Sequence, residues 1–186
     1  MKPPNVITYN ASKALKMKKN LIKATHARAV FPGTFDPVTY GHIDLIQRAL
    51  GIFDEVIVAV AHQGTEKKPL YSVKERVRFL REATRPMGER VTVDDFRGLV
   101  VDYARKKGAG TMIRGLRMIS DFEYEFQMAL TNRRLAGDIE TILLMPHESC
   151  AYLSSRLIKE VAILNGDISS FAPPFVLKAI KKKFKN

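Results

Sequence analysis

The sequence predicts a single α/β domain with a Rossmann-like, doubly wound sheet of five parallel strands and flanking helices. Short apolar runs alternate with segments whose apolar residues recur every three or four positions, which is the pattern of repeated strand–helix units. The run Val56 to Ala61 is continuously apolar, as in a strand covered on both faces. The chain carries no repeat and no low-complexity linker, so residues 28–186 form one domain in this interpretation.

The elements follow in order along the chain. We expect strands at 29–31, 55–61, 90–94, 111–114 and 140–145. Helices are expected at 42–50, from 72, at 99–107, 120–136 and 154–165, and from 173. Ser72 with Glu75, and Ser120 with Glu123, have the capping-box spacing that marks a helix start. Glycines at 51, 108, 137 and 166 are expected to end four of the helices.

The net charge of +12 lies at the two ends of the chain. Residues 1–28 hold seven lysines and arginines and no acid, and residues 178–186 hold five and no acid, so the part between them is formally neutral. We therefore interpret the ends as solvated, with residues 1–27 a basic extension that is disordered or loosely helical. The alternative is a nucleic-acid-binding module that uses both basic ends.

Several functional classes are excluded by what the sequence lacks. The longest apolar run is far shorter than the ~20 residues of a membrane-spanning helix, so no membrane partner is expected. No phosphate-binding P-loop, dinucleotide fingerprint, serine nucleophile elbow or closely spaced His/Cys metal set appears. The single cysteine, Cys150, cannot form an intramolecular disulfide, which favours a reducing cytoplasm.

Polar groups suited to phosphates follow four of the five predicted strands. Ligands bind at the carboxyl ends of such strands, where the winding of the sheet reverses, so the loops after the first and fourth strands are the first candidates. Thr34, Phe35 and His42 come from the first loop, beside a helix N-terminus that can hold an anion. The run 114–117, Arg-Gly-Leu-Arg, can clamp phosphate oxygens. Lys67 or Lys68, and the helix start at Ser154-Ser155, add further anion-binding groups.

Each of these residues also has a purely structural interpretation. A lone histidine at a helix start can be structural or exposed. Arg114 and Arg117 can pair with Asp121, Glu123 or Glu125 in a surface network. Ser154 needs no ligand to cap a helix, and Cys150 is expected to be a small buried or half-buried residue and not a nucleophile.

Five ordered blocks carry a resemblance to a known family. Residues 32–37, Pro-Gly-Thr-Phe-Asp-Pro, followed by Thr39-Tyr40-Gly41-His42, resemble the T-x-G-H signature of nucleotidyltransferases. Together with 67–69, 113–117, 121–125 and 153–160, the blocks are similar to bacterial phosphopantetheine adenylyltransferases over about residues 28–184. Two positions depart from the family pattern: residue 150 is Cys where an aromatic is common, and residue 156 is Arg where Ser is often found.

The resemblance implies transfer of an adenylyl group from ATP to 4′-phosphopantetheine, giving dephospho-CoA and pyrophosphate by direct in-line attack. It also implies Mg²⁺, held mainly by the ATP phosphates, and a homohexamer. A related nucleotidyltransferase with another phosphorylated acceptor is the alternative.

By the same resemblance, His42 stabilises the transition state. The residues expected to bind ATP are Thr34, Phe35, His42, Gly115, Leu116, Arg117, Glu125, Cys150, Ala151, Tyr152, Leu153, Ser154, Ser155 and Arg156. Those expected to bind phosphopantetheine are Thr34, Lys67, Val100 and Arg114.

Overall fold

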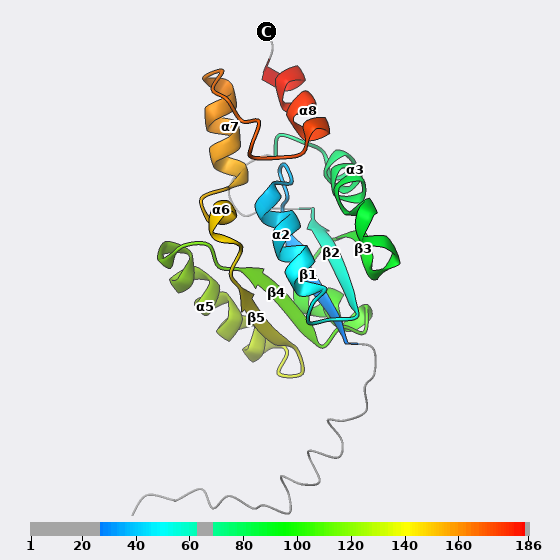
Figure 1. Cartoon of the computed structure of the whole chain (residues 1–186). Helices are drawn as coiled ribbons and strands as arrows, with labels where there is room; N and C mark the ends of the chain where they lie inside the picture. Colours follow the sequence, from blue (N-terminus) through cyan, green and yellow to red (C-terminus); the bar gives the residue numbers. More distant parts are fainter. Residues whose placement is uncertain (1–26, 63–68, 185–186) are drawn as a thin grey trace, which may run out of the picture.

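The computed structural model describes residues 27–62 and 69–184. Its centre is a sheet of five strands, all parallel, in the order β3-β2-β1-β4-β5 (Figure 1). The strands are β1 (Arg28–Gly33), β2 (Glu55–Ala61), β3 (Val91–Phe96), β4 (Thr111–Gly115) and β5 (Glu140–Leu144). The predicted α/β class and the five strands are thereby confirmed. Because β1 has β2 on one side and β4 on the other, the winding reverses between β1 and β4.

Helices cover both faces of this sheet (Figure 1). They are α2 (Tyr40–Ala49), α3 (Val73–Thr84), α4 (Val100–Lys106), α5 (Ile119–Leu135), α6 (Glu148–Ala151), α7 (Ser155–Ile163) and α8 (Pro174–Phe184). Buried side chains of α2, α3, α7 and α8 share one core with one face of the sheet, and α4 with the end of α5 closes the other. The apolar run of β2 is buried on both sides, as its continuous pattern predicts.

Of the three helix starts predicted at serine residues, two are confirmed and one is wrong. Ser72 caps α3 with Glu75 in a reciprocal capping box, and Ser154 caps α7. The capping box expected at Ser120 does not form, because α5 already begins at Ile119 after Met118. The carboxylate of Asp121 accepts the backbone N–H of Arg117, at 3.3 Å, and so stabilises this earlier start.

Some local features differ from the prediction or were not predicted. The segment 150–156 comprises the end of α6, residues 152–154 and the start of α7, and α6 was not predicted. A short 3₁₀ helix, η1 (Arg85–Arg90), precedes β3. At the end of α7 it is Asn165, at φ 57°, and not Gly166 that takes the left-handed conformation. Asn165 can do so because its short polar side chain tolerates this region.

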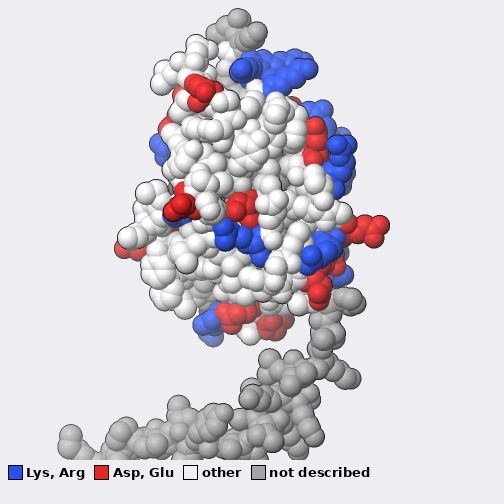
Figure 2. All heavy atoms as spheres, in the orientation of Figure 1, with Lys and Arg blue, Asp and Glu red and all other residues white. Residues whose placement is uncertain are grey.

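Ala27, the first residue that the structure describes, is hydrogen-bonded to the domain. Its backbone N–H donates to the Asp54 carboxylate at 2.8 Å, and its carbonyl accepts the Asp54 N–H at 2.9 Å. The rest of the predicted extension, 1–26, and the loop with Lys67 and Lys68 lie outside the described residues. Lys181 to Lys183, in the last turn of α8, are exposed, and Figure 2 shows a blue patch at that end of the molecule. None of the helices in 27–62 and 69–184 is both long and apolar enough to cross a membrane.

Candidate active site

A cavity of about 650 Å³ lies at the carboxyl ends of β1 and β4, where the winding of the sheet reverses. Its wall is built from the loops after these two strands, the start of α2 and the start of α7. The sequence-predicted residues in the wall are Thr34, Phe35, His42, Val100, Arg114, Gly115, Arg117, Glu125, Leu153, Ser154, Ser155 and Arg156. The structure therefore brings together most of the residues that the sequence singled out.

The loop after β1 is held in an unusual conformation by packing. Phe35 has a positive φ of 49°, which costs a non-glycine residue on the order of 1–3 kcal/mol. Its buried ring makes edge-on contacts with Phe31, at 5.4 Å between centroids, and with His42, at 5.0 Å. A Cβ on Gly33 would lie 2.9 Å from this ring, so the loop requires glycine there. These contacts fix the backbone that presents Thr34, which is exposed, in the cavity wall.

His42 is part of the cap of α2. The Thr39 hydroxyl accepts the backbone N–H of His42 at 3.3 Å, and the Thr39 backbone N–H donates to Nδ1 of His42 at 3.1 Å. Because Nδ1 accepts a hydrogen bond, the hydrogen bonding assigns the proton of the neutral ring to Nε2. The structural interpretation of His42 is therefore correct for Nδ1, while Nε2 remains a donor for a ligand in the cavity.

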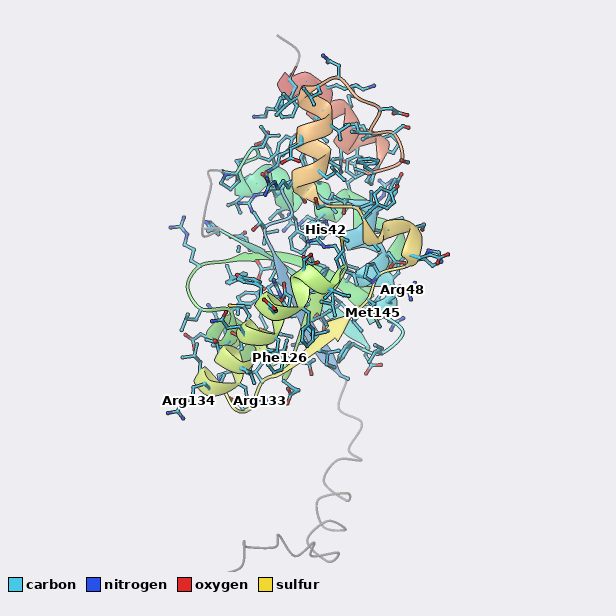
Figure 3. The ribbon with its side chains drawn as sticks, turned by 90° about the vertical axis from the view of Figure 1, so that its left-hand side faces the viewer. His42, Arg48, Phe126, Arg133, Arg134 and Met145 are labelled. Atoms are coloured by element: carbon cyan, nitrogen blue, oxygen red, sulfur yellow. The ribbon has the colours of Figure 1, made fainter. Side chains whose placement is uncertain are left out.

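The protonation state of His42 follows from its surroundings. Burial, and secondarily the positive charge of Arg117, lower the pKa of His42 from 6.5 to about 4. The ring is therefore neutral at physiological pH and acts as a hydrogen-bond donor, not as a cation. In Figure 3 the His42 label lies above α5, whereas Arg133 and Arg134 are at the lower end of that helix.

Arg114, at the end of β4, forms a paired hydrogen bond with Glu125 of α5. Nε and Nη2 of Arg114 each donate to a Glu125 carboxylate oxygen at 2.7 Å, and Nη1 donates to the Pro32 carbonyl at 3.1 Å. Burial works against the charged guanidinium, but Glu125 outweighs it and holds the pKa of Arg114 above its ordinary value. The pair joins β4, α5 and the end of β1 beside the cavity. Glu125 touches the cavity wall while its carboxylate is engaged by Arg114.

Arg117 connects the loop after β4 to the start of α7. Its Nε donates to Asp121 at 3.1 Å, and its Nη1 donates to the Leu153 carbonyl at 3.2 Å. The surface-network interpretation is thus right in that Arg114 and Arg117 have carboxylate partners, Glu125 and Asp121. Both arginines nevertheless stand in the cavity wall, where a phosphate can compete for them.

The start of α7 is tied to the loop after β1. The Ser154 hydroxyl accepts the backbone N–H of Leu157 at 3.0 Å, and the Ser155 hydroxyl donates to the Pro37 carbonyl at 2.7 Å. Arg156 is exposed and pairs with Glu160 at 2.7 Å. The structural interpretation of Ser154 as a helix cap is therefore correct, and the same helix end borders the cavity.

The other residues predicted to contact a substrate are not among those that line the cavity in the described part of the chain. Leu116 donates its backbone N–H to the Leu144 carbonyl at 2.9 Å, between β4 and β5. Cys150 and Ala151 are half-buried in α6, and exposed Tyr152 packs edge-on against Phe171. Their contacts with a nucleotide stay predictions, as does that of Lys67, which is outside the described residues.

Two buried charged groups near the cavity, one of them in its wall, were missed at the sequence level. The Asp36 carboxylate, 4% exposed, accepts the backbone N–H groups of Leu70 and Tyr71 and the ammonium of Lys159, all within 2.9 Å. Arg76, on α3, is 1% exposed and donates to three backbone carbonyls. An available signal was the position of Arg76 among the apolar residues of its helix, since arginines are rarely buried without a purpose.

Residues 27–62 and 69–184 contain no cluster of side chains that could bind a metal ion. No group of three or more His, Cys, Asp or Glu side chains in these ranges is arranged to hold a metal ion. The two carboxylates that border the cavity, Asp36 and Glu125, are engaged by Lys159 and Arg114.

Comparison with known proteins places the chain in a family. Residues 30–161 match the model of the cytidylyltransferase-like family. The chain is 50% identical over 156 residues to the phosphopantetheine adenylyltransferase of Thermodesulfovibrio yellowstonii, covering 84% of this chain and 96% of that protein. It is 51% identical over 157 residues to the enzyme of the same name from Caldanaerobacter subterraneus, covering 84% of this chain and 97% of that protein.

A solved structure, a putative nicotinate-nucleotide adenylyltransferase from Vibrio parahaemolyticus, has the same fold. Its TM-score is 0.63 at 18% identity, with 84% of this chain and 99% of that chain covered. From the half-identical relatives and the matching family model, we conclude that the chain belongs to the phosphopantetheine adenylyltransferases, within the cytidylyltransferase-like family.

Proposed function

We propose that the protein transfers an adenylyl group from ATP to 4′-phosphopantetheine, giving dephospho-CoA and pyrophosphate in coenzyme A biosynthesis. The observation that carries this proposal is the cavity at the reversal point, which combines the Nε2 donor of His42 with the guanidinium groups of Arg114 and Arg117. The half-identical relatives named phosphopantetheine adenylyltransferase support the same activity.

The reaction joins two anions and needs no covalent enzyme intermediate. A phosphate oxygen of the acceptor attacks the α-phosphorus of ATP, a new P–O bond forms, and the bond to the oxygen that bridges to the β-phosphorus breaks. Pyrophosphate leaves with that electron pair. The protein has to hold both phosphates in line and to stabilise the charge that develops between them.

The residues of the cavity divide between the two substrates in this proposal. Thr34, Arg114 and Lys67 bind the phosphate of phosphopantetheine, and Val100 lies along its pantetheine arm. His42, through Nε2–H, and Arg117 bind the phosphates of ATP and stabilise the transition state. The remaining nucleotide contacts come from Phe35, Gly115, Leu116, Glu125 and residues 150–156.

Mg²⁺ fits this site as an ion carried by the nucleotide. The carboxylates of Asp36 and Glu125 already accept hydrogen bonds from Lys159 and Arg114, which leaves the ATP phosphates as the main source of oxygen ligands. When bound, Mg²⁺ neutralises part of the phosphate charge.

A homohexamer in the cytoplasm completes the proposal. The outer face of α5 exposes apolar side chains, Ile119 at 92%, Phe126 at 50% and Leu130 at 48%, and Met145 after β5 is 71% exposed. Phe126 and Met145 lie on the same side of the molecule (Figure 3). Several large apolar side chains exposed together in this way are typical of an interface between subunits. Sedimentation equilibrium of the purified chain measures the subunit count directly.

The test of the activity is pyrophosphate release from ATP and Mg²⁺ with 4′-phosphopantetheine, run in parallel with nicotinamide mononucleotide as acceptor. We expect turnover with phosphopantetheine alone. Turnover with the mononucleotide alone would instead support a related nucleotidyltransferase with another phosphorylated acceptor. Mass spectrometry of the nucleotide product identifies dephospho-CoA independently of the coupled assay.

A further inference from the structure

The charge of Arg76 is buried beneath the candidate active site. The residue lies in the first turns of α3 and is 1% exposed, among the largest fully buried side chains of the described chain. An arginine in such a place is costly unless each of its donors is satisfied. Its location therefore calls for an explanation beyond packing.

The partners of Arg76 are backbone carbonyls from three separate segments. Nη1 donates to the Thr34 carbonyl at 2.6 Å and to the Ala61 carbonyl at 3.0 Å, and Nε donates to the Tyr71 carbonyl at 3.2 Å. One planar guanidinium thus joins the loop after β1, the end of β2 and the residue before the cap of α3. No salt bridge of Arg76 with a carboxylate is found in 27–62 and 69–184.

Asp36 reinforces the same arrangement from the opposite side. Its carboxylate accepts the N–H groups of Leu70 and Tyr71 at 2.9 Å and the ammonium of Lys159 at 2.8 Å. Burial lowers the pKa of Arg76 and the nearby charge of Asp36 opposes that effect, while an arginine remains protonated at neutral pH. Tyr71 is therefore held through its N–H by Asp36 and through its carbonyl by Arg76.

Of the three hydrogen bonds of Arg76, the one to the Thr34 carbonyl reaches a residue of the cavity wall. It belongs to the peptide that precedes Phe35, whose φ of 49° determines how that peptide plane is turned. The hydrogen bond from Arg76 to the Thr34 carbonyl holds this plane, and Thr34 is one of the residues that line the cavity.

We propose that Arg76 is a positioning residue for the adenylyl transfer: by fixing the Thr34 carbonyl relative to the end of β2, it places Thr34 to receive the phosphate of the acceptor. This inference rests on the proposed function. Arg76 does not touch substrate and acts through the loop after β1.

Lysine at this position separates charge from geometry. Arg76→Lys keeps the positive charge, but a single ammonium cannot reproduce the planar fork that reaches Thr34, Ala61 and Tyr71. We expect the KM for 4′-phosphopantetheine to rise about tenfold, as for loss of one well-oriented hydrogen bond, with a smaller change in the KM for ATP. In Arg76→Ala, millimolar guanidinium should lower the raised acceptor KM again.

A matched control uses the other buried polar side chain of α3. The Thr84 hydroxyl donates to the Leu80 carbonyl at 2.8 Å, within α3 itself, so Thr84→Ala weakens the same helix without removing a hydrogen bond to Thr34. We expect Thr84→Ala to lower the urea midpoint and to leave both KM values unchanged.

The outcomes are distinct. Arg76→Lys with a lowered urea midpoint and a wild-type ratio of the two KM values overturns the inference, because the residue is then structural only. The same holds for a folded Arg76→Ala protein whose acceptor KM equals that of the wild type. A wild-type protein that does not turn over phosphopantetheine contradicts the proposed function itself, before any variant is compared.

Discussion

The backbone N–H of Thr39 donates to Nδ1 of His42 at 3.1 Å, and this contact assigns the ring proton of neutral His42 to Nε2. The same imidazole therefore takes part in the helix cap through Nδ1, and Nε2 is left as the donor nitrogen of a residue that lines the cavity. The capping box of α2 fixes the ring orientation before a substrate binds, which is the preorganisation that electrostatic catalysis requires.

Replacement of His42 should remove catalysis without unfolding the protein. We expect His42→Ala to lower kcat by about 10²–10³, the effect of losing one preorganised donor to the developing charge. His42→Asn is the matched variant, since its amide oxygen can accept the Thr39 N–H while no donor reaches the position of Nε2. Rates of pyrophosphate release and urea unfolding separate the two roles. A kcat of His42→Asn close to that of the wild type would contradict the catalytic role of Nε2.

The protonation of His42 should couple stability to pH. Because burial and Arg117 lower its folded-state pKa to about 4, below the 6.5 of the unfolded chain, the unfolded state binds more protons between these values. The contribution of His42 is complete above pH 6.5 and is lost as the pH falls toward 4, by at most about 3 kcal/mol. Urea unfolding at several pH values should show this dependence in the wild type and a smaller one in His42→Gln. An NMR titration that places the His42 pKa at 6.5 or above would refute it.

The influence of Arg117 on His42 can be measured by itself. Arg117→Met removes the positive charge, so the pKa of His42 should rise while remaining below 6.5, because burial is the larger cause. The KM for ATP should rise as well, since a phosphate-binding guanidinium is lost. The same NMR titration and initial rates at varied ATP provide both readouts. Asp121→Asn serves as the control, because it removes the carboxylate charge that pairs with Arg117 while the positive charge of Arg117 is kept.

Variants of the Arg114–Glu125 pair should separate its effect on the free energy of unfolding from its effect on acceptor binding. Glu125 is 8% exposed, so Glu125→Gln leaves a partly buried guanidinium without its counter-charge and should lower the free energy of unfolding by about 2 kcal/mol. Replacing both residues by apolar ones, Arg114→Met with Glu125→Leu, should recover most of that loss. The double variant should still bind phosphopantetheine weakly, because Arg114 is absent. Recovery of a normal acceptor KM would argue against Arg114 as a phosphate ligand.

Removal of residues 1–26 tests whether the basic extension has a role in the reaction. The hydrogen bonds of Ala27 to Asp54 stay in place in the truncated chain, so we expect kcat and both KM values to stay within about twofold of the full-length chain. Fluorescence anisotropy with labelled RNA and DNA at physiological salt tests the alternative. Binding by the full-length chain that disappears on truncation would support a nucleic-acid role for the extension.

The local part of the fold could be predicted from the sequence because its causes are local. The apolar run of β2, the Ser72–Glu75 capping box and the T-x-G-H block all act over a few residues, and all three are found in the structure. The wrong prediction at Ser120 also has a local cause. Two possible helix starts lie within a few residues, and the Asp121 side chain favours the earlier one.

The tertiary structure determined which partners the site residues contact. The sequence by itself determined that Thr34, His42, Arg114 and Arg117 belong together, since parallel strands meet at one sheet edge. It could not tell that Arg76 supports Thr34 across 42 positions of the chain, because no periodicity relates such distant residues. That contact arises only when the folded sheet brings the loop after β1, the end of β2 and α3 together, because a buried guanidinium is stable only with hydrogen-bond partners.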